Sequence, residues 1–152
     1  MRRARLWWAL LLLIAACADA SSPLDPGAVE TQSLPGVAGI EHVVVAEGHA
    51  AEFGGTFAIR SALRNTGTEP AHLRVRTCYL RDDDLRSERP GLALHEPLML
   101  CDTLERELTL APGEVTESLA ITGTGPSGAS YPLHVRHALD PEHWTEVTLR
   151  IP

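Results

Sequence analysis

The sequence predicts one all-β domain, an antiparallel β-sandwich of about seven to eight strands that follows a signal peptide and a flexible linker. Apolar and polar residues alternate through most of residues 40–152, and this period of two is typical of half-buried strands. Turn-forming clusters such as NTGTEP and LAPGE separate the alternating runs at intervals of about ten residues, as in sandwiches and barrels. No helical periodicity follows the N-terminal apolar run, so a helical fold is not expected.

The N-terminus is predicted to be a lipoprotein signal peptide of residues 1–16. Three arginines among the first five residues precede an apolar run that ends at Ala16 and is shorter than the roughly 20 residues of a membrane span. The motif IAAC, which ends at Cys17, resembles the bacterial lipobox, in which a cysteine directly follows small residues. The alternative is cleavage after the small-x-small motif ADA at Ala20, which would release the protein.

The resemblance to bacterial lipoproteins implies a lipid anchor on Cys17, made of a diacylglyceryl thioether and an amide-linked chain such as palmitate. Two or three buried acyl chains hold a protein stably on a membrane, whereas one does not. Ala18, not aspartate, follows the cysteine, and in lipoproteins of cells with two membranes this pattern indicates the outer membrane. We therefore expect a protein that is lipid-anchored in the cell envelope.

The charge of the chain argues against a nucleic-acid or anionic-lipid surface. All 13 basic residues are arginine, and three of them lie in the leader. The mature chain would carry ten basic and 20 acidic residues, a net charge of about −10. An excess of acidic groups repels phosphates, so no nucleic-acid partner is expected.

Residues 17–39 are expected to form the lipidated N-terminus and a disordered linker. The stretch SSPLDPGAVETQSLPGVAG is rich in proline and glycine and has no strand or helix periodicity. The folded domain then spans residues 40–152, a length that supports a single hydrophobic core. Its expected strands are IEHVVVAE, residues 57–64, 72–79, 92–101, 104–110 and 115–122, and a closing pair, YPLHVRHAL and TEVTLRI, around the turn DPEH.

The strands over 57–64 and 72–79 are predicted to form a hairpin around NTGTEP that pairs Arg64 with His72. Its outward face would carry a basic stripe, which a glycan, a carboxylate-bearing peptide or an acidic partner surface could bind through guanidinium forks. The alternative is that Glu105 and Glu107 on a neighbouring strand neutralise the stripe. The stripe consists of Arg60, Arg64, Arg74 and Arg76.

Once Cys17 is lipidated, Cys78 and Cys101 are the two cysteines left, and such a pair in an exported domain predicts a disulfide. The bridge would span the polar loop RDDDLRSERPG at 81–91, whose carboxylates are hard oxygens of the kind that calcium prefers. The loop lacks EF-hand spacing and holds arginines between its carboxylates, so a solvated, self-compensating loop is the simpler interpretation. His134 and His137 are three apart on a predicted strand and would face opposite sides, so no metal site is assigned.

The segments LRNTGTEPAHLRV, LTLAPGE and YPLHVRH resemble immunoglobulin-like domains of bacterial exported proteins, including the BsuPI-like family of proteinase inhibitors. The resemblance covers most of residues 40–152 and implies an immunoglobulin-like β-sandwich.

No catalytic motif is present: G-x-S-x-G, H-E-x-x-H and phosphate-binding glycine loops are missing from the sequence. We therefore expect a membrane-tethered, non-catalytic binding or structural module of the bacterial envelope, without a cofactor, whose partner is an envelope protein or a glycan. The alternatives are a proteinase-inhibitor-like domain that acts through exposed loops, a metal-binding envelope domain, and an ancillary subunit of a larger envelope complex.

Overall fold

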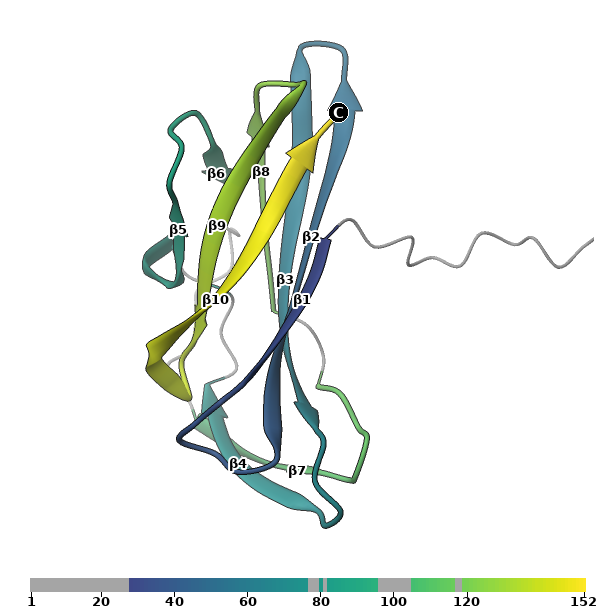
Figure 1. Ribbon diagram of the computed structural model, residues 1–152, viewed down its shortest axis with the longest axis vertical. Helices are drawn as coiled ribbons and strands as arrows, with labels where there is room; N and C mark the ends of the chain where they lie inside the picture. Colours follow the sequence, from purple (N-terminus) through teal and green to yellow (C-terminus); the bar gives the residue numbers. More distant parts are fainter. Residues whose placement is uncertain (1–27, 77–79, 81, 96–104, 117–118) are drawn as a thin grey trace, which may run out of the picture.

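A computed structural model describes residues 28–76, 80, 82–95, 105–116 and 119–152. Over these residues the protein is all-β and antiparallel, as predicted, with ten strands and one short 3-10 turn (Figure 1). The elements are β1 Ala28–Ser33, β2 Ile40–Ala51, β3 Gly54–Asn65, β4 Ala71–Arg76, η1 Asp82–Asp84, β5 Leu85–Ser87, β6 Ala93–His95, β7 Glu105–Leu110, β8 Leu119–Gly125, β9 Ala129–His137 and β10 Asp140–Ile151.

Two sheets form the body of the molecule. One has five strands in the order β1-β2-β3-β8-β6, and the other has three in the order β10-β9-β5. Their inner faces share one hydrophobic core, to which Phe57 and Ile59 of β3 and Tyr131 and Leu133 of β9 contribute fully buried side chains. The arrangement is a β-sandwich, because two sheets bury their apolar faces against each other.

Alternation along the strands produces this burial. On β9, Tyr131, Leu133 and Val135 are buried, whereas the intervening Pro132 and His134 face outward. The same pattern runs along β10, which pairs with β9 from Ala129 and Ile151 to the β9–β10 turn. The predicted closing pair is therefore confirmed, and so is the opening strand, which is β2. The turn of the closing pair lies at residues 138–139, however, and the predicted turn DPEH forms the start of β10.

The sheets approach each other closely where β2 meets β10. A Cβ at Gly48 of β2 would overlap the backbone carbonyl oxygen of Arg150 on β10. Glycine is therefore required here by space and not by backbone conformation.

A smaller core closes one end of the molecule. The pair β4–β7 packs Leu73, Val75 and Leu110 against Ile40 and Leu63 at the ends of β2 and β3. This pair forms a separate two-stranded sheet below the main sandwich (Figure 1).

Asn65, the last residue of β3, connects these two parts and is 1% exposed. Its Nδ2 donates to the carbonyl oxygens of Glu69 (2.8 Å) and Leu110 (2.9 Å), and its Oδ1 accepts from the Gly67 N–H (2.8 Å). The side chain thus satisfies backbone groups of the turn after β3 and of β7 at a buried position.

The predicted hairpin between residues 57–64 and 72–79 is wrong. β3 pairs with β2 along its whole length and with β8 on its other side, so both of its edges are occupied. β4 leaves the sheet and pairs with β7, with Ala71 opposite Leu110. Because a strand has only two edges, the turn at 66–70 passes the chain to a new sheet and does not fold it back on β3.

The linker prediction is also wrong for residues 28–39. β1 pairs with β2 from Ala28 opposite Ala46 to Ser33 opposite Glu41. Leu34, the residue after β1, is 3% exposed. β1 exposes most of its residues, which is why it shows no periodicity. Within 81–91, predicted as a loop, Leu85–Ser87 forms β5 beside β9. The signal peptide, the rest of the linker, Cys17, Cys78 and Cys101 lie outside the described residues.

Candidate functional site

The predicted basic stripe is not assembled by the fold. Arg60 and Arg64 lie on β3 in the five-stranded sheet, whereas Arg74 and Arg76 lie on β4 in the β4–β7 pair. Because the hairpin that would align them does not form, the four residues do not share a face.

Each stripe arginine with a described side chain also has a glutamate partner. Arg60 pairs with Glu47 at 3.2 Å, Arg64 with Glu41 and Arg74 with Glu105 at 2.7 Å. Neutralisation by Glu105 was the alternative prediction, but Glu41 and Glu47 are partners that the proposed hairpin did not include. The side chain of Arg76 lies outside the part of the chain that the structure describes.

A different surface gathers aromatic and charged side chains: the outer face of β10-β9-β5. Arg86 of β5, His134 of β9 and Glu146 of β10 are cross-strand neighbours in one row. Arg136 and Trp144 are opposite each other in the next row. Since residues two apart on a strand share a face, all five project from the side away from the core. We call these five residues together with Glu88 the tryptophan face.

Trp144 is held by two arginines. The register of β10 shifts between Asp140 and Trp144, and such an irregularity redirects side chains at the end of a strand pair. The guanidinium carbon of Arg86 lies 4.3 Å from the centroid of the Trp144 ring, and that of Arg136 lies 5.0 Å away. Arg136 also pairs with Asp84 at 3.0 Å, whereas Arg86 forms no ion pair with another described residue.

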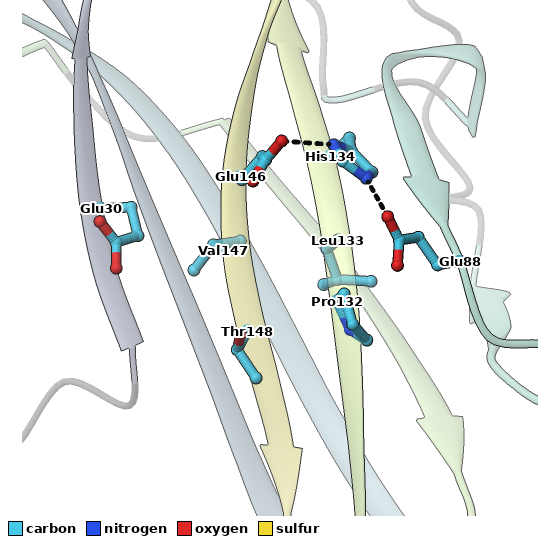
Figure 2. A pocket seen from close by; sticks show the side chains of 8 residues that line it. All are labelled: Glu30, Glu88, Pro132, Leu133, His134, Glu146, Val147 and Thr148. Atoms are coloured by element: carbon cyan, nitrogen blue, oxygen red, sulfur yellow. Dashed lines mark hydrogen bonds and ion pairs between the residues drawn. The ribbon is translucent and has the colours of Figure 1, made fainter.

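His134 lies between two carboxylates. Its Nε2 is 3.0 Å from Glu88 Oε1, and its Nδ1 is 3.7 Å from Glu146 Oε1 (Figure 2). A neutral imidazole donates through one nitrogen only, whereas the protonated ring donates to both sides. The arrangement therefore presents carboxylate oxygens and an imidazole close together on an exposed surface.

Two open hollows meet at this triad. The first has a volume of about 530 Å³ and is lined by the tryptophan side of the face, and the second has a volume of about 420 Å³ and extends toward β1 (Figure 2). Glu88, His134 and Glu146 border both. The first hollow is also lined by Arg86, Ser87 and Trp144. The second is also lined by Glu30, Pro132, Leu133, Val147 and Thr148.

A second polar cluster is sealed inside the sandwich. His42 is 0% exposed; its Nδ1 is 2.8 Å from Thr145 Oγ1 and its Nε2 is 2.7 Å from Ser61 Oγ. The ring of His137 meets it edge to face at 5.6 Å between centroids. Burial lowers the pKa of His42 to about 3 and that of His137 to about 4, with the neighbouring ring contributing at His42. Both rings are therefore neutral at pH 7.

Ser61 and His42 have the spacing of a nucleophile and a base, which the sequence did not reveal. Ser61 is 1% exposed, however, and the pair lies between the sheets, where a substrate has no access. In the structure the hydrogen bond between Ser61 and His42 gives each of these buried polar side chains a partner.

The histidines in the described part of the chain do not converge on a metal site. His134 and His137 face opposite sides of β9, as predicted from their spacing. His143 Nδ1 lies 2.7 Å from Asp140 Oδ1, and this hydrogen bond is the main cause of the lowered pKa of Asp140. Among the described residues no group of three His, Cys, Asp or Glu side chains could hold a metal ion.

No protein-family model, curated protein or solved structure matches the chain. Within the described residues, no helix has the length and apolar character needed to cross a bilayer. The role of the tryptophan face is therefore inferred from its geometry.

Four of the six residues of this face could be placed from the sequence. The predicted closing pair around DPEH places His134, Arg136, Trp144 and Glu146 on outward positions of two neighbouring strands. Arg86 and Glu88 could not be placed on this face from the sequence, because β5 has only three residues and pairs with β9 from a distant part of the chain.

Proposed function

We propose that the protein is a membrane-tethered, non-catalytic binding module of the bacterial cell envelope, and that the tryptophan face is its binding surface. The signal peptide and the lipobox ending at Cys17 support export and lipidation. Few residues separate Cys17 from Ala28, and even a fully extended segment of about ten residues reaches only roughly 35 Å. A domain on such a tether meets ligands that lie close to the membrane.

The strand order supports an immunoglobulin-like arrangement. β2-β3-β8-β6 facing β10-β9-β5 has the four-on-three order of constant-type immunoglobulin sandwiches. In this comparison β1 is an additional edge strand, and the pair β4–β7 is an addition at one end. Such sandwiches present binding residues on loops and outer faces while their cores remain apolar.

The observation that carries the proposal is the position of Trp144 on an outer sheet face. Tryptophan and arginine are enriched in the residues that dominate binding energies, and here they border an open hollow together with His134 and two glutamates. A partly exposed tryptophan beside an arginine that has no ion pair with another described residue contributes little to the core of the sandwich. Binding is the function that explains this arrangement best.

A pull-down from detergent-solubilised envelopes tests the proposal. The lipidated chain should capture an envelope component, and Trp144→Ala should lose it. Phe53→Ala is the matched control, because Phe53 is a 94% exposed aromatic residue on the turn between β2 and β3, at the opposite end of the sandwich (Figure 1). Equal recovery with Trp144→Ala and with wild type would remove the tryptophan face from consideration.

Two further tests address the covalent features. Cys17→Ser should abolish labelling with palmitate and release the protein from membranes; a wild-type protein without lipid label would refute the anchor. Cys78 and Cys101 should resist alkylation in denaturant until they are reduced, because a disulfide has no free thiol. Replacing both with serine should lower the free energy of unfolding by roughly 3 kcal/mol, because the bridge restricts the unfolded chain.

Proteinase inhibition is a second candidate function, and the exposed Phe53 favours it. A fully exposed aromatic side chain at the tip of a hairpin could enter the primary specificity pocket of a chymotrypsin-like enzyme. Incubation with such a protease should then give inhibition that Phe53→Ala removes. A chain that is cleaved after Phe53, or that leaves the protease fully active, would rule this function out.

A further inference from the structure

We infer that the two hollows of the tryptophan face form one binding site for a neutral pyranose oligosaccharide, with Trp144 as its stacking platform. This inference rests on the proposed function and names the ligand class for the same surface. The proposed ligand is a neutral saccharide, and tighter binding of an anionic one would overturn the inference.

A planar guanidinium group already lies over the ring of Trp144. The guanidinium of Arg86 lies 4.3 Å from the ring centroid, so the indole faces a positively polarised group. The C–H bonds on one side of a pyranose ring are also positive at their edge and pack on the negative face of an aromatic ring. Arg86 is exposed and has no ion pair to another described residue, and an exposed cation–π contact is weak enough for a ligand to displace it.

The groups beside the platform suit hydroxyl groups. Glu88 and Glu146 present carboxylate oxygens that accept hydrogen bonds, and His134 between them offers a ring nitrogen. A sugar hydroxyl both donates and accepts, so neighbouring hydroxyls can bind a carboxylate and an imidazole at once. Both glutamates are largely exposed, so their oxygens are open to a ligand.

The balance of charge favours a neutral ligand. In the first hollow an anion that approached Arg86 would also meet Glu88 and Glu146, and a cation at these glutamates would meet Arg86. The second hollow adds Glu30 and is lined by no arginine, so it disfavours an anion further. The charge of Arg136 is already matched by Asp84. Mixed charges at short distance repel neither sign strongly and select ligands by hydrogen bonding.

The length of the site favours an oligosaccharide. Trp144 borders the first hollow and Thr148 the second, and four residues along β10 span roughly 13 Å. The shared triad lies between them. A monosaccharide would fill one hollow, whereas a linear chain that follows β10 would contact Trp144, the triad and Thr148 together.

The test is a binding titration of the lipidated protein in detergent with chitotetraose, cellotetraose and maltotetraose, the corresponding monosaccharides, and tetragalacturonate as the anionic probe. At least one neutral tetrasaccharide should bind at least about tenfold more tightly than its monosaccharide and than tetragalacturonate. Calorimetry gives the affinity. Tryptophan fluorescence should change on binding in wild type and not in Trp144→Phe, since Trp144 is the only tryptophan that follows the predicted signal peptide in the sequence.

Variants separate the site from the fold. Trp144→Ala should weaken tetrasaccharide binding by about thirtyfold or more, the usual effect of losing a central tryptophan. Trp144→Phe should weaken it less, because an aromatic face remains, and Phe53→Ala should leave it unchanged. Far-UV circular dichroism and thermal unfolding identify any variant that fails to fold, and Glu146→Gln then supplies a second variant of the site, expected to weaken binding several-fold.

Three results would overturn the inference: no binding of the neutral tetrasaccharides, tighter binding of tetragalacturonate, or wild-type affinity in Trp144→Ala. If Trp144→Ala loses its envelope partner in the pull-down while no tetrasaccharide binds, the proposed function stands and the saccharide assignment fails. If the variant keeps its envelope partner as well, both fail.

Discussion

Mild acid should destabilise this protein through its two buried histidines. The pKa of His42 is lowered to about 3 and that of His137 to about 4, mainly by burial, whereas in the unfolded chain both return to about 6.5. The unfolded state therefore binds more protons than the folded state between about pH 6.5 and pH 4. Stability is complete above pH 6.5 and falls as the pH decreases through this window.

The size of the effect follows from these values. Between pH 7 and pH 5 an unfolded histidine becomes almost fully protonated, while His42 and His137 in the folded state stay neutral. Each of the two therefore lowers the free energy of unfolding by about 2 kcal/mol. The two together amount to about 4 kcal/mol, a large part of the 5–15 kcal/mol typical of folded domains. The lowered pKa of Asp140 contributes little between pH 7 and pH 5, because an unfolded aspartate protonates mainly below pH 5.

Urea unfolding at pH 7 and pH 5, followed by far-UV circular dichroism, measures the loss directly. A His42→Gln variant starts from a lower stability but should lose only about half as much between the two pH values, since one of the two groups is removed. Proton NMR of the histidine rings gives the folded-state pKa values independently. A wild-type loss below about 1 kcal/mol, or a His42 ring that titrates near pH 6.5, would refute the reasoning.

Three substitutions test the packing. Asn65→Ala should lower the free energy of unfolding in urea by roughly 2–4 kcal/mol, because buried backbone groups would lose their hydrogen-bond partner; a loss below about 1 kcal/mol would contradict that role. Tyr131→Phe should leave stability equal or slightly higher, since the buried Tyr131 hydroxyl has no hydrogen-bond partner among the described residues, and a clear loss would point to one. Gly48→Ala should lower stability by about 1–3 kcal/mol, whereas Gly36→Ala, where the new Cβ meets only ordinary contacts, should change it little.

Alternation in the sequence was sufficient to predict which faces are buried but not which strands are neighbours. β2, β9 and β10 are long and bury every second residue, so their identity and the β9–β10 pairing could be read directly. The pairing of residues 57–64 with 72–79 was inferred from proximity along the chain, and it failed because β2 and β8 occupy both edges of β3. Periodicity contains no information about such competition for edges.

Elements with little burial escaped prediction for a related reason. β1 is an edge strand with most side chains exposed, and β5 has three residues, so neither shows a period of two. The basic stripe depended on the failed hairpin, whereas the tryptophan face depends on β5 lying beside β9. Both outcomes show that a surface site built across strands is only as predictable as the pairing beneath it.

Along β10, the buried cluster and the tryptophan face are physically connected. Trp144 faces outward, while the next residue, Thr145, faces the core and holds His42 at 2.8 Å. Backbone pairing fixes the register of β10 against β9, but β10 contacts β2 across the sandwich without pairing with it. The side-chain hydrogen bond between His42 and Thr145 supplies a fixed point. Because a slip of one residue would exchange the inner and outer faces of β10, the interaction that keeps Thr145 inside also keeps Trp144 and Glu146 outside.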